Sequence, residues 1–341
     1  MIVRKQAYAR VGLAGNPSDG YHGKTVAFTI SDFSAEVTLY ESPELELRTG
    51  PQDLAIFDSV QDLLENVRRT GYYGGIRLLK AATKKFAEYC AAEGYSLPSH
   101  NFTVLYSTNI PRQVGLGGSS AIITAVMRAL MEFFDVHIPD PVLPNVVLSA
   151  ESDELGLTAG LQDRVVQAYG GLVYMDFDRA YMDEHGFGRY ERLDAAMLPP
   201  VYIAYRHDLG KESSTAHIKV RDLYELGDAH VVQTMGEIAS LADAARDAIE
   251  RGDQKGLAAV INRNFDLRRS IFDIRPEDMQ MIETARKAGA SSSFCGSGGA
   301  VVGTAPGQAG LERVRREMEA AGYAFVVPHV VNGHRLTPDD D

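Results

Sequence analysis

A glycine-rich loop between a strand-like run and a long amphipathic helix constrains the fold of this chain most strongly. The run NFTVLYS at residues 101–107 has the β-branched and aromatic content of a strand, and the loop PRQVGLGGSS follows it. The next apolar residues recur at helical spacing, namely Ile122, Ile123, Val126, Leu130, Phe133 and Phe134. Glycines let a backbone approach a ligand closely, and a helix N-terminus favours an anion. The segment therefore predicts either a phosphate-binding loop, whose two serines could contact phosphate and Mg²⁺, or a tight turn capped by serine.

A second stretch, SDGYHGKT at residues 18–25, differs from the P-loop pattern G-x-x-x-x-G-K-[ST] only at Ser18. A P-loop must lead into a helix whose N-terminus holds the phosphates. The sequence after Gly23, KTVAFTI, is instead β-branched and strand-like. The stretch is therefore not a P-loop. The polar turn GNPSD at residues 15–19, which overlaps its start, is the better candidate for binding a ligand.

A second glycine loop, Cys295-Gly296-Ser297-Gly298-Gly299, lies between two strand-like runs. It is typical of a hairpin turn. Because another glycine and serine loop occurs far away in the chain, the alternative is that both loops face one phosphate-bearing ligand.

Two carboxylates and one arginine stand out among the charged residues. Glu151 falls near the end of a predicted helix, and Asp163 falls at the start of the next one, among apolar and small residues. Arg10 interrupts an apolar strand just before the GNPSD turn, so it is either a strand-end charge or a paired, inward-facing group. Most such residues are simply solvated surface charges.

The order of the predicted elements favours an α+β fold. Strands and helices alternate without the regular βαβ cadence of a parallel sheet. Helices are expected at residues 56–67, 76–92, 122–134, 145–155 and 163–169, within 218–288, and at 307–321. Strands are expected at residues 7–15, 24–30, 35–40, 101–107, 172–177, 199–205, 291–303 and 324–331. The length of 341 residues predicts two domains, with the polar stretch 178–197 as the boundary.

Composition excludes several classes of protein. The formal net charge of −12 argues against nucleic acid or an anionic membrane as the main partner. Two cysteines are too few for a disulfide framework or a metal cluster. No leader-like segment and no transmembrane run is apparent, so a cytoplasmic protein is expected.

Four motifs in order along the chain resemble those of the GHMP small-molecule kinases, a family that includes galactokinase, homoserine kinase and mevalonate kinase. They are GNPSD, GLGGSSA preceded by Pro111, GLQD at residues 160–163, and CGSGGA at residues 295–300. The longer stretches ARVGLAGNPSDGYHGKT, NIPRQVGLGGSSAI and AGLQDRVVQAYGGLVYMDF look most like the plant-type glucuronokinases. This likeness extends over nearly the whole chain.

The resemblance implies a fold and a set of functional residues. An N-terminal domain like ribosomal protein S5 domain 2 would cover residues 1–190, and a ferredoxin-like domain residues 191–341, with ATP and substrate in the cleft between them. The implied ATP-binding residues are Pro111, Gly115, Leu116, Gly117, Gly118, Ser119, Ser120, Ala121, Gly296, Ser297 and Gly298. The implied Mg²⁺ ligands are Ser120 and Glu151, the implied base is Asp163, and Arg10 would pair with it. Asn16, Ser18 and Asp19 would hold sugar hydroxyls.

The implied reaction is transfer of the γ-phosphate of ATP to the anomeric hydroxyl of D-glucuronate, giving glucuronate 1-phosphate and ADP. A uronate carboxylate needs a cation, and arginine has the best geometry for it. Lys24 and Arg164 are the expected substrate-binding cations, with Arg112 and His22 as further candidates. GNPSD stands where galactokinases have G-E-H-T-D, so the sugar contacts cannot be transferred from galactose.

Other readings stay open. The same chemistry could act on galacturonate, fucose or a heptose 7-phosphate, and a non-catalytic sensor could hold ATP and a sugar without turnover. The presence of Arg10, Ser120, Glu151 and Asp163 disfavours the sensor. The sugar-kinase-like first motif and GLQD disfavour a decarboxylase of the diphosphomevalonate type. Both a monomer and a homodimer are compatible with the sequence.

Overall fold

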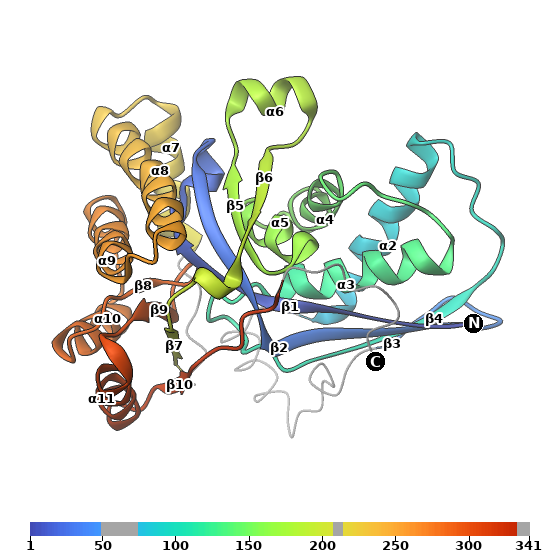
Figure 1. Cartoon of the computed structure of the whole chain (residues 1–341). Coiled ribbons are helices and arrows are strands. Elements are labelled where there is room, and N and C mark those ends of the chain that lie inside the picture. The colour runs from blue at the N-terminus through green and yellow to red at the C-terminus, as the bar shows by residue number, and fades with distance from the viewer. Residues whose placement is uncertain (49–73, 207–213, 333–341) are drawn as a thin grey trace, which may run out of the picture. The chain divides into compact units, whose positions relative to one another are not determined.

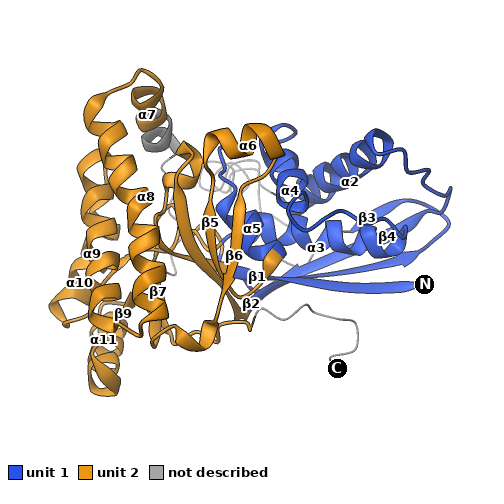
Figure 2. Ribbon diagram, turned by 45° about the horizontal axis from the view of Figure 1, so that its top comes forward, with its two compact units in different colours: residues 1–9, 33–111, 117–168 blue, residues 10–32, 112–116, 169–341 orange. Residues whose placement is uncertain are grey.

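A computed structural model describes residues 1–48, 74–206 and 214–332, with the backbone alone for 214–218. Contacts divide the chain into two compact units (Figure 2). Unit 1 holds residues 1–9, 33–111 and 117–168, and unit 2 holds residues 10–32, 112–116 and 169–341. Both units are discontinuous in sequence, so the domain ranges 1–190 and 191–341 remain a prediction. The helix expected at 56–67 lies outside the described residues.

Two long strands, β1 (Ile2–Ala14) and β2 (Lys24–Glu41), contribute to both units. In unit 1, the second half of β2 pairs antiparallel with β4 (Phe102–Thr108), and Ala35 lies opposite Thr108. The short strand β3 (Glu46–Arg48) runs parallel to β4. The separate strands expected at 24–30 and 35–40 are one strand, because the intervening residues stay extended.

The described helices of unit 1 are α2 (Gly75–Ala92), α3 (Gly118–Phe133), α4 (Leu143–Ser152) and α5 (Gln162–Tyr169). The last residue of α5, Tyr169, groups with unit 2. Helix α2 packs on α3 and α4 (Figure 1). Of the apolar positions that predict α3, Ile122, Ile123, Val126 and Leu130 are buried, and Phe133 and Phe134 at its C-terminal end are partly buried. Each of the buried side chains contributes about 1.5–3 kcal/mol through its removal from water. This packing fixes the N-terminus of α3, and therefore the end of the first glycine loop.

In unit 2, the first half of β2 pairs with β5 (Leu172–Asp176), which pairs with β6 (Arg189–Leu193). The charged stretch expected as a domain boundary contains α6 (Arg179–His185), β6 and a 3₁₀ turn, η3 (Ala195–Met197). The turn that follows β1 contains a second 3₁₀ turn, η1 (Ser18–Tyr21). The GKT segment enters strand β2 and no helix, which confirms that it is not a P-loop.

The second sheet of unit 2 consists of β7 (Val201–Tyr205), β8 (Ser293–Phe294), β9 (Ala300–Thr304) and β10 (Ala324–Val326). Its order is β10-β7-β9-β8, with antiparallel pairing throughout. The order along the sheet is thus fourth, first, third and second strand in chain order, which is the ferredoxin-like arrangement. The predicted α+β class and ferredoxin-like C-terminal part are confirmed.

The helices of unit 2 that follow β7 are α7 (Ser214–Glu225), α8 (Ala229–Glu250), α9 (Gln254–Ile271), α10 (Pro276–Lys287) and α11 (Gly307–Ala320). Helix α9 contacts β8 and β9, and α8 packs along α9 (Figure 1). The core beneath α9 and α10 includes Tyr202, Phe265 and Met281, all without exposed surface. Within the described ranges, no helix has both the length and the apolar character that crossing a bilayer demands.

Candidate active site

The first glycine loop ends at the N-terminus of helix α3. Gly115 and Gly117 both have positive φ angles, +73° and +71°, and Gly117 is the N-cap of the helix. As a glycine, this N-cap residue has no side chain that could hydrogen-bond to the first N–H groups of the helix. Its first backbone N–H groups therefore remain available to an anion, as a phosphate-binding loop requires.

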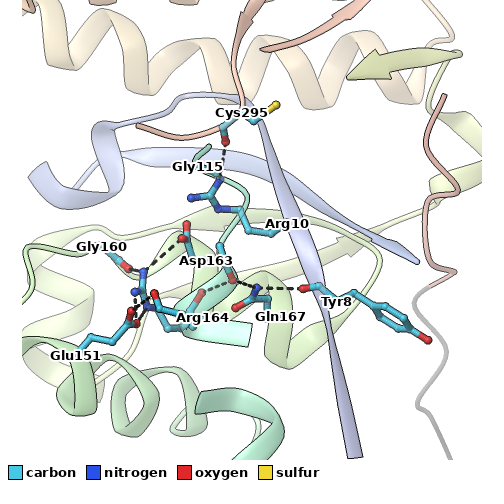
Figure 3. Close-up of polar contacts among 12 residues, drawn as sticks. Tyr8, Arg10, Gly115, Glu151, Gly160, Asp163, Arg164, Gln167 and Cys295 are labelled. Carbon is cyan, nitrogen blue, oxygen red and sulfur yellow. Dashed lines mark hydrogen bonds and ion pairs between the residues drawn. The ribbon is translucent and has the colours of Figure 1, made fainter. Parts of the chain in front are cut away.

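Glu151, at the end of α4, forms the centre of a buried polar cluster in unit 1 (Figure 3). Its Oε1 accepts a hydrogen bond of 2.6 Å from the Ser119 hydroxyl. Its Oε2 accepts two hydrogen bonds from Arg164, one of them from Nε at 2.7 Å. The side chains of Glu151 and Arg164 are 2% and 5% exposed, so this is an ion pair largely removed from water.

Asp163 lies in the first turn of α5, where the helix dipole favours a negative charge. Its Oδ2 lies 3.5 Å from a guanidinium nitrogen of Arg164, and its side chain is 15% exposed. Gln167, one turn further on, donates from Nε2 to the carbonyls of Tyr8 and Gly117 at 3.0 and 2.9 Å (Figure 3). Helix α5 is thereby tied to both β1 and the glycine loop, which fixes the position of Asp163.

Arg10 joins the two glycine loops within unit 2. One terminal nitrogen of its guanidinium donates to the carbonyls of Gly115 and Cys295 at 2.7 and 2.6 Å (Figure 3). A Cβ added at Gly115 would lie 3.0 Å from the backbone of Ser297 and Gly298, so only glycine permits this approach. Burial raises the pKa of the Cys295 thiol to about 12, although the Arg10 charge opposes this. Cys295 thus contributes its carbonyl oxygen, and its thiol is uncharged at neutral pH.

The polar turn at residues 15–19 is held against helix α9 and the second glycine loop. The backbone N–H of Gly15 donates to Asn264 Oδ1 at 2.7 Å, and Asn264 Nδ2 donates to the Asn16 carbonyl at 2.9 Å. Asn16 Nδ2 donates to the Gly296 carbonyl at 3.4 Å. The turn is therefore a rigid element of unit 2, which also contains the second glycine loop.

Comparison with known proteins identifies the family. The model of the GHMP kinases N terminal domain matches residues 77–171, and that of the GHMP kinases C terminal domain matches residues 245–324. Two curated proteins of Arabidopsis thaliana are each 43% identical to the chain. The one named probable glucuronokinase 2 aligns over 99% of this chain and 94% of its own length. The one named glucuronokinase 1 aligns over 95% and 91%.

The chain belongs to the GHMP kinase family. The fold agrees, since the crystal structure of Lactococcus lactis galactokinase complexed with galactose superposes with a TM-score of 0.78 at 16% identity, covering 97% of this chain and 94% of that one. As a GHMP kinase, the protein is a phosphotransferase with ATP as a substrate, as the motifs predict.

The geometry of this GHMP kinase favours Ser119 over Ser120 as the partner of Glu151. Ser120 has no exposed surface, and its hydroxyl donates to the Gly117 carbonyl at 3.1 Å. In a helix, consecutive side chains point in directions about 100° apart, so only one of the two can face α4. Glu151 thus pairs with Ser119 in this structure, and the expected metal pair of Ser120 and Glu151 remains a prediction.

Three of the expected substrate residues of the GHMP kinase are occupied by protein groups. Ser18 is buried, and its hydroxyl donates to the Lys24 carbonyl at 2.8 Å. Lys24 Nζ lies 3.0 Å from Asp243 Oδ2 in an ion pair. Arg164 is bound to Glu151, as described above. The two cations expected to bind a substrate carboxylate thus already have carboxylate partners.

The Lys24 pair is reinforced by a tyrosine. Tyr174 donates to Asp243 Oδ1 at 2.6 Å. Burial, followed by the hydrogen bond to Asp243, raises the pKa of the Tyr174 hydroxyl. Burial alone would raise the pKa of Asp243, but the hydrogen bonds from Tyr174 and Lys24 and the Lys24 charge lower it overall. The group is a stable ionic cluster on unit 2.

Sequence reasoning missed Gln167, which ties α5 to β1 and the first glycine loop, and Asn264, which holds the polar turn against α9. A helical-wheel analysis would have found Gln167, because it lies on the same face of α5 as Asp163 and Arg164. No local pattern marks Asn264, since its partners at residues 15 and 16 are about 250 positions away in the sequence. Arg10 and Asp163 belong to different units, and their pairing remains a prediction.

The donor set around Glu151 is compatible with a hard cation. Mg²⁺ in kinases binds through one or two carboxylates together with substrate phosphates and water. Glu151 Oε1 and the Ser119 hydroxyl supply oxygen donors of this kind beside the glycine loop. Among the residues that the structure describes, there is no group of three or more His, Cys, Asp or Glu that could hold a metal by itself. A metal held here would need nucleotide phosphates and water to complete its coordination, and its binding remains a prediction.

Proposed function

We propose that this GHMP kinase transfers the γ-phosphate of ATP to the anomeric hydroxyl of D-glucuronate, giving glucuronate 1-phosphate and ADP. The supporting observation is the 43% identity to two curated glucuronokinases over nearly the full length of both partners. A match over the whole chain includes the polar turn, both glycine loops and the GLQD segment together.

Phosphate binding is assigned to the first glycine loop and the start of α3. The uncapped N-terminus of α3 and the two positive-φ glycines give backbone N–H groups that can surround an oxyanion. The proposed phosphate contacts are Pro111 and Gly115 to Gly117 in the loop and Gly118 to Ala121 at the start of α3, and Gly296, Ser297 and Gly298 are proposed as a second nucleotide contact. Ser297 is exposed, so its hydroxyl is accessible to a ligand.

The metal and base roles fall to the cluster on α4 and α5. Glu151 and Ser119 would hold Mg²⁺, which when bound supplies charge neutralisation for the ATP phosphates. Asp163 accepts the proton of the attacking sugar hydroxyl and orients that oxygen. The transition state of phosphoryl transfer can be loose, so orientation carries much of the catalytic effect. Arg164, through its ion pair, holds Glu151 in a single orientation.

The sugar hydroxyls are assigned to the polar turn, through Asn16 and Asp19. Asn16 retains one amide N–H beyond its bond to Gly296, and Asp19 is partly exposed on the 3₁₀ turn. Two free, buried cysteines are compatible with a reducing compartment such as the cytoplasm.

An ADP-release panel tests the proposal. Purified enzyme with Mg²⁺ and ATP is assayed against glucuronate, galacturonate, galactose, fucose and a heptose 7-phosphate. Turnover with glucuronate at the highest kcat/KM of the panel is expected. Turnover with another sugar only would refute the substrate, and turnover with none would favour a non-catalytic sensor.

A further inference from the structure

Arg268 on helix α9 is a buried cation to which no described carboxylate is paired. It is 2% exposed, and one terminal nitrogen donates to the Gly296 carbonyl at 2.7 Å. Its guanidinium lies over the rings of Phe272 and Phe294, 5.4 and 5.1 Å from their centroids. In the described part of the chain, no carboxylate lies within 4 Å of it, and its Nε has no hydrogen-bond partner. Buried charges in proteins are normally paired, so this arrangement points to a missing anion.

The nearest acidic groups do not compensate this charge. Asp278, which is also buried, is bound at 2.9 Å to Arg275 and accepts the N–H of Gly299. Burial, with a smaller contribution from the positive charge of Arg10, lowers the pKa of Arg268 to about 10. The negative charges of Asp278 and Asp19 oppose this shift. Arg268 is therefore still protonated at neutral pH, while its charge is only partly balanced.

Arg268 lies next to the segment proposed to hold the sugar. Asn264 and Arg268 are one helical turn apart and occupy the same face of α9. Asn264 binds the backbone of residues 15 and 16, and Arg268 and Asn16 both donate to the Gly296 carbonyl. All of these residues belong to unit 2, so their proximity does not depend on how the two units are placed.

The other cations considered for a substrate carboxylate are less suitable. Lys24 is paired with Asp243, and Arg164 with Glu151. His22 is exposed at a positive-φ turn position. Arg268 differs from Lys24 and His22 because it is buried and carries a planar donor fork, and from Arg164 because none of the described carboxylates pairs with it.

We propose that Arg268 is the specificity-determining residue that binds the carboxylate of a hexuronic acid substrate. This inference rests on the proposed function, since it presupposes that a sugar acid is phosphorylated. A carboxylate placed against the guanidinium would supply the missing counter-ion and two hydrogen-bond acceptors. A neutral hexose would leave the buried charge uncompensated, which gives selectivity for the acid. An ATP phosphate is the alternative oxyanion, and the test separates the two.

The experiment compares D-glucuronate with D-glucuronamide, which replaces the carboxylate by a neutral amide of nearly the same shape. Wild-type enzyme should prefer the acid in kcat/KM by about 10–100-fold, as expected for charge-assisted hydrogen bonds. Arg268→Gln should lose most of this preference through a higher KM for glucuronate, with the KM for ATP changed less than about threefold. Arg269→Gln is the matched control, because Arg269 is the next residue of α9 and is exposed.

Arg268→Lys covers the case in which the glutamine variant does not fold. It keeps the charge but loses the planar fork, so a smaller selective rise in the KM for glucuronate is expected. Equal losses on the acid and the amide, or a rise confined to the KM for ATP, would overturn the inference. If wild-type enzyme phosphorylates neutral sugars but not glucuronate, the proposed function and this inference both fail. If wild-type enzyme phosphorylates glucuronate but Arg268→Gln keeps the wild-type preference for the acid over the amide, the inference alone is refuted.

Discussion

Replacing Arg164 by methionine should destabilise unit 1 strongly, because it leaves Glu151 as a buried charge without a cation. The Arg164 and Glu151 side chains are 5% and 2% exposed, and after the substitution the carboxylate keeps only the Ser119 hydroxyl of the partners described above. Breaking such a pair by removing one partner costs about 3–5 kcal/mol. At about 2–4 °C for each kcal/mol in a domain of this size, the thermal midpoint should fall by roughly 6–20 °C.

The assay is urea and thermal unfolding of the full chain without ligands, followed by circular dichroism. The double variant Glu151→Gln, Arg164→Met removes both charges, so Arg164→Met should cost far less in that background. Lys84→Met is the matched control, because Lys84 pairs with Glu154 in the same unit but is 55% exposed, and it should leave the midpoint nearly unchanged. An Arg164→Met variant as stable as wild type, or an equal cost in both backgrounds, would refute the reasoning.

Three further outcomes test other parts of the site. Asp163→Asn should lower ADP formation with the accepted sugar by about 100-fold or more, as for loss of a general base, and a loss of only a few fold would disprove the base role. Ser119→Ala should raise the Mg²⁺ concentration needed for half-maximal ADP formation, and Ser120→Ala should not; the reverse result would assign the metal contact to Ser120. The pKa of Asp243 is lowered in the folded protein, so its ionised form stabilises the fold. Wild type should therefore be more stable than Asp243→Asn at neutral pH, and this difference should disappear as the pH falls below about 4. Urea midpoints measured between pH 7 and pH 3 check this, and a constant difference would contradict it.

Local sequence patterns predicted the elements around the site well, because each pattern reports its own chain segment. The apolar spacing from Ile122 to Leu130 predicted α3, and the β-branched run after Gly23 predicted the start of β2. The apolar pattern was less informative at residues 178–197. The charged residues there suggested a domain boundary, but the structure has strand β6 within this stretch, paired with β5. An edge strand with mostly exposed side chains lacks the alternation that a sequence reader needs.

The sequence marked candidate functional segments, but it did not give the hydrogen-bond or ion-pair partner of each side chain. The motifs marked the two glycine loops, the polar turn and the GLQD segment. They gave no means of choosing between Ser119 and Ser120, which depends on the rotation of α3 against α4. They also assigned Lys24 and Arg164 to the substrate, although each is paired with a carboxylate of the protein.

The sequence by itself determined the family, the fold class and the order of the functional motifs, since these depend on residue types and their spacing. Tertiary structure alone decided which charges are already balanced and which are not. Asp243 lies 219 residues from Lys24, and Gly296 lies 28 residues from Arg268. Such ionic and hydrogen-bond partners meet only when helices and strands pack. The physical reason is that burial of a charge, and the presence or absence of its counter-ion, are properties of the packed chain.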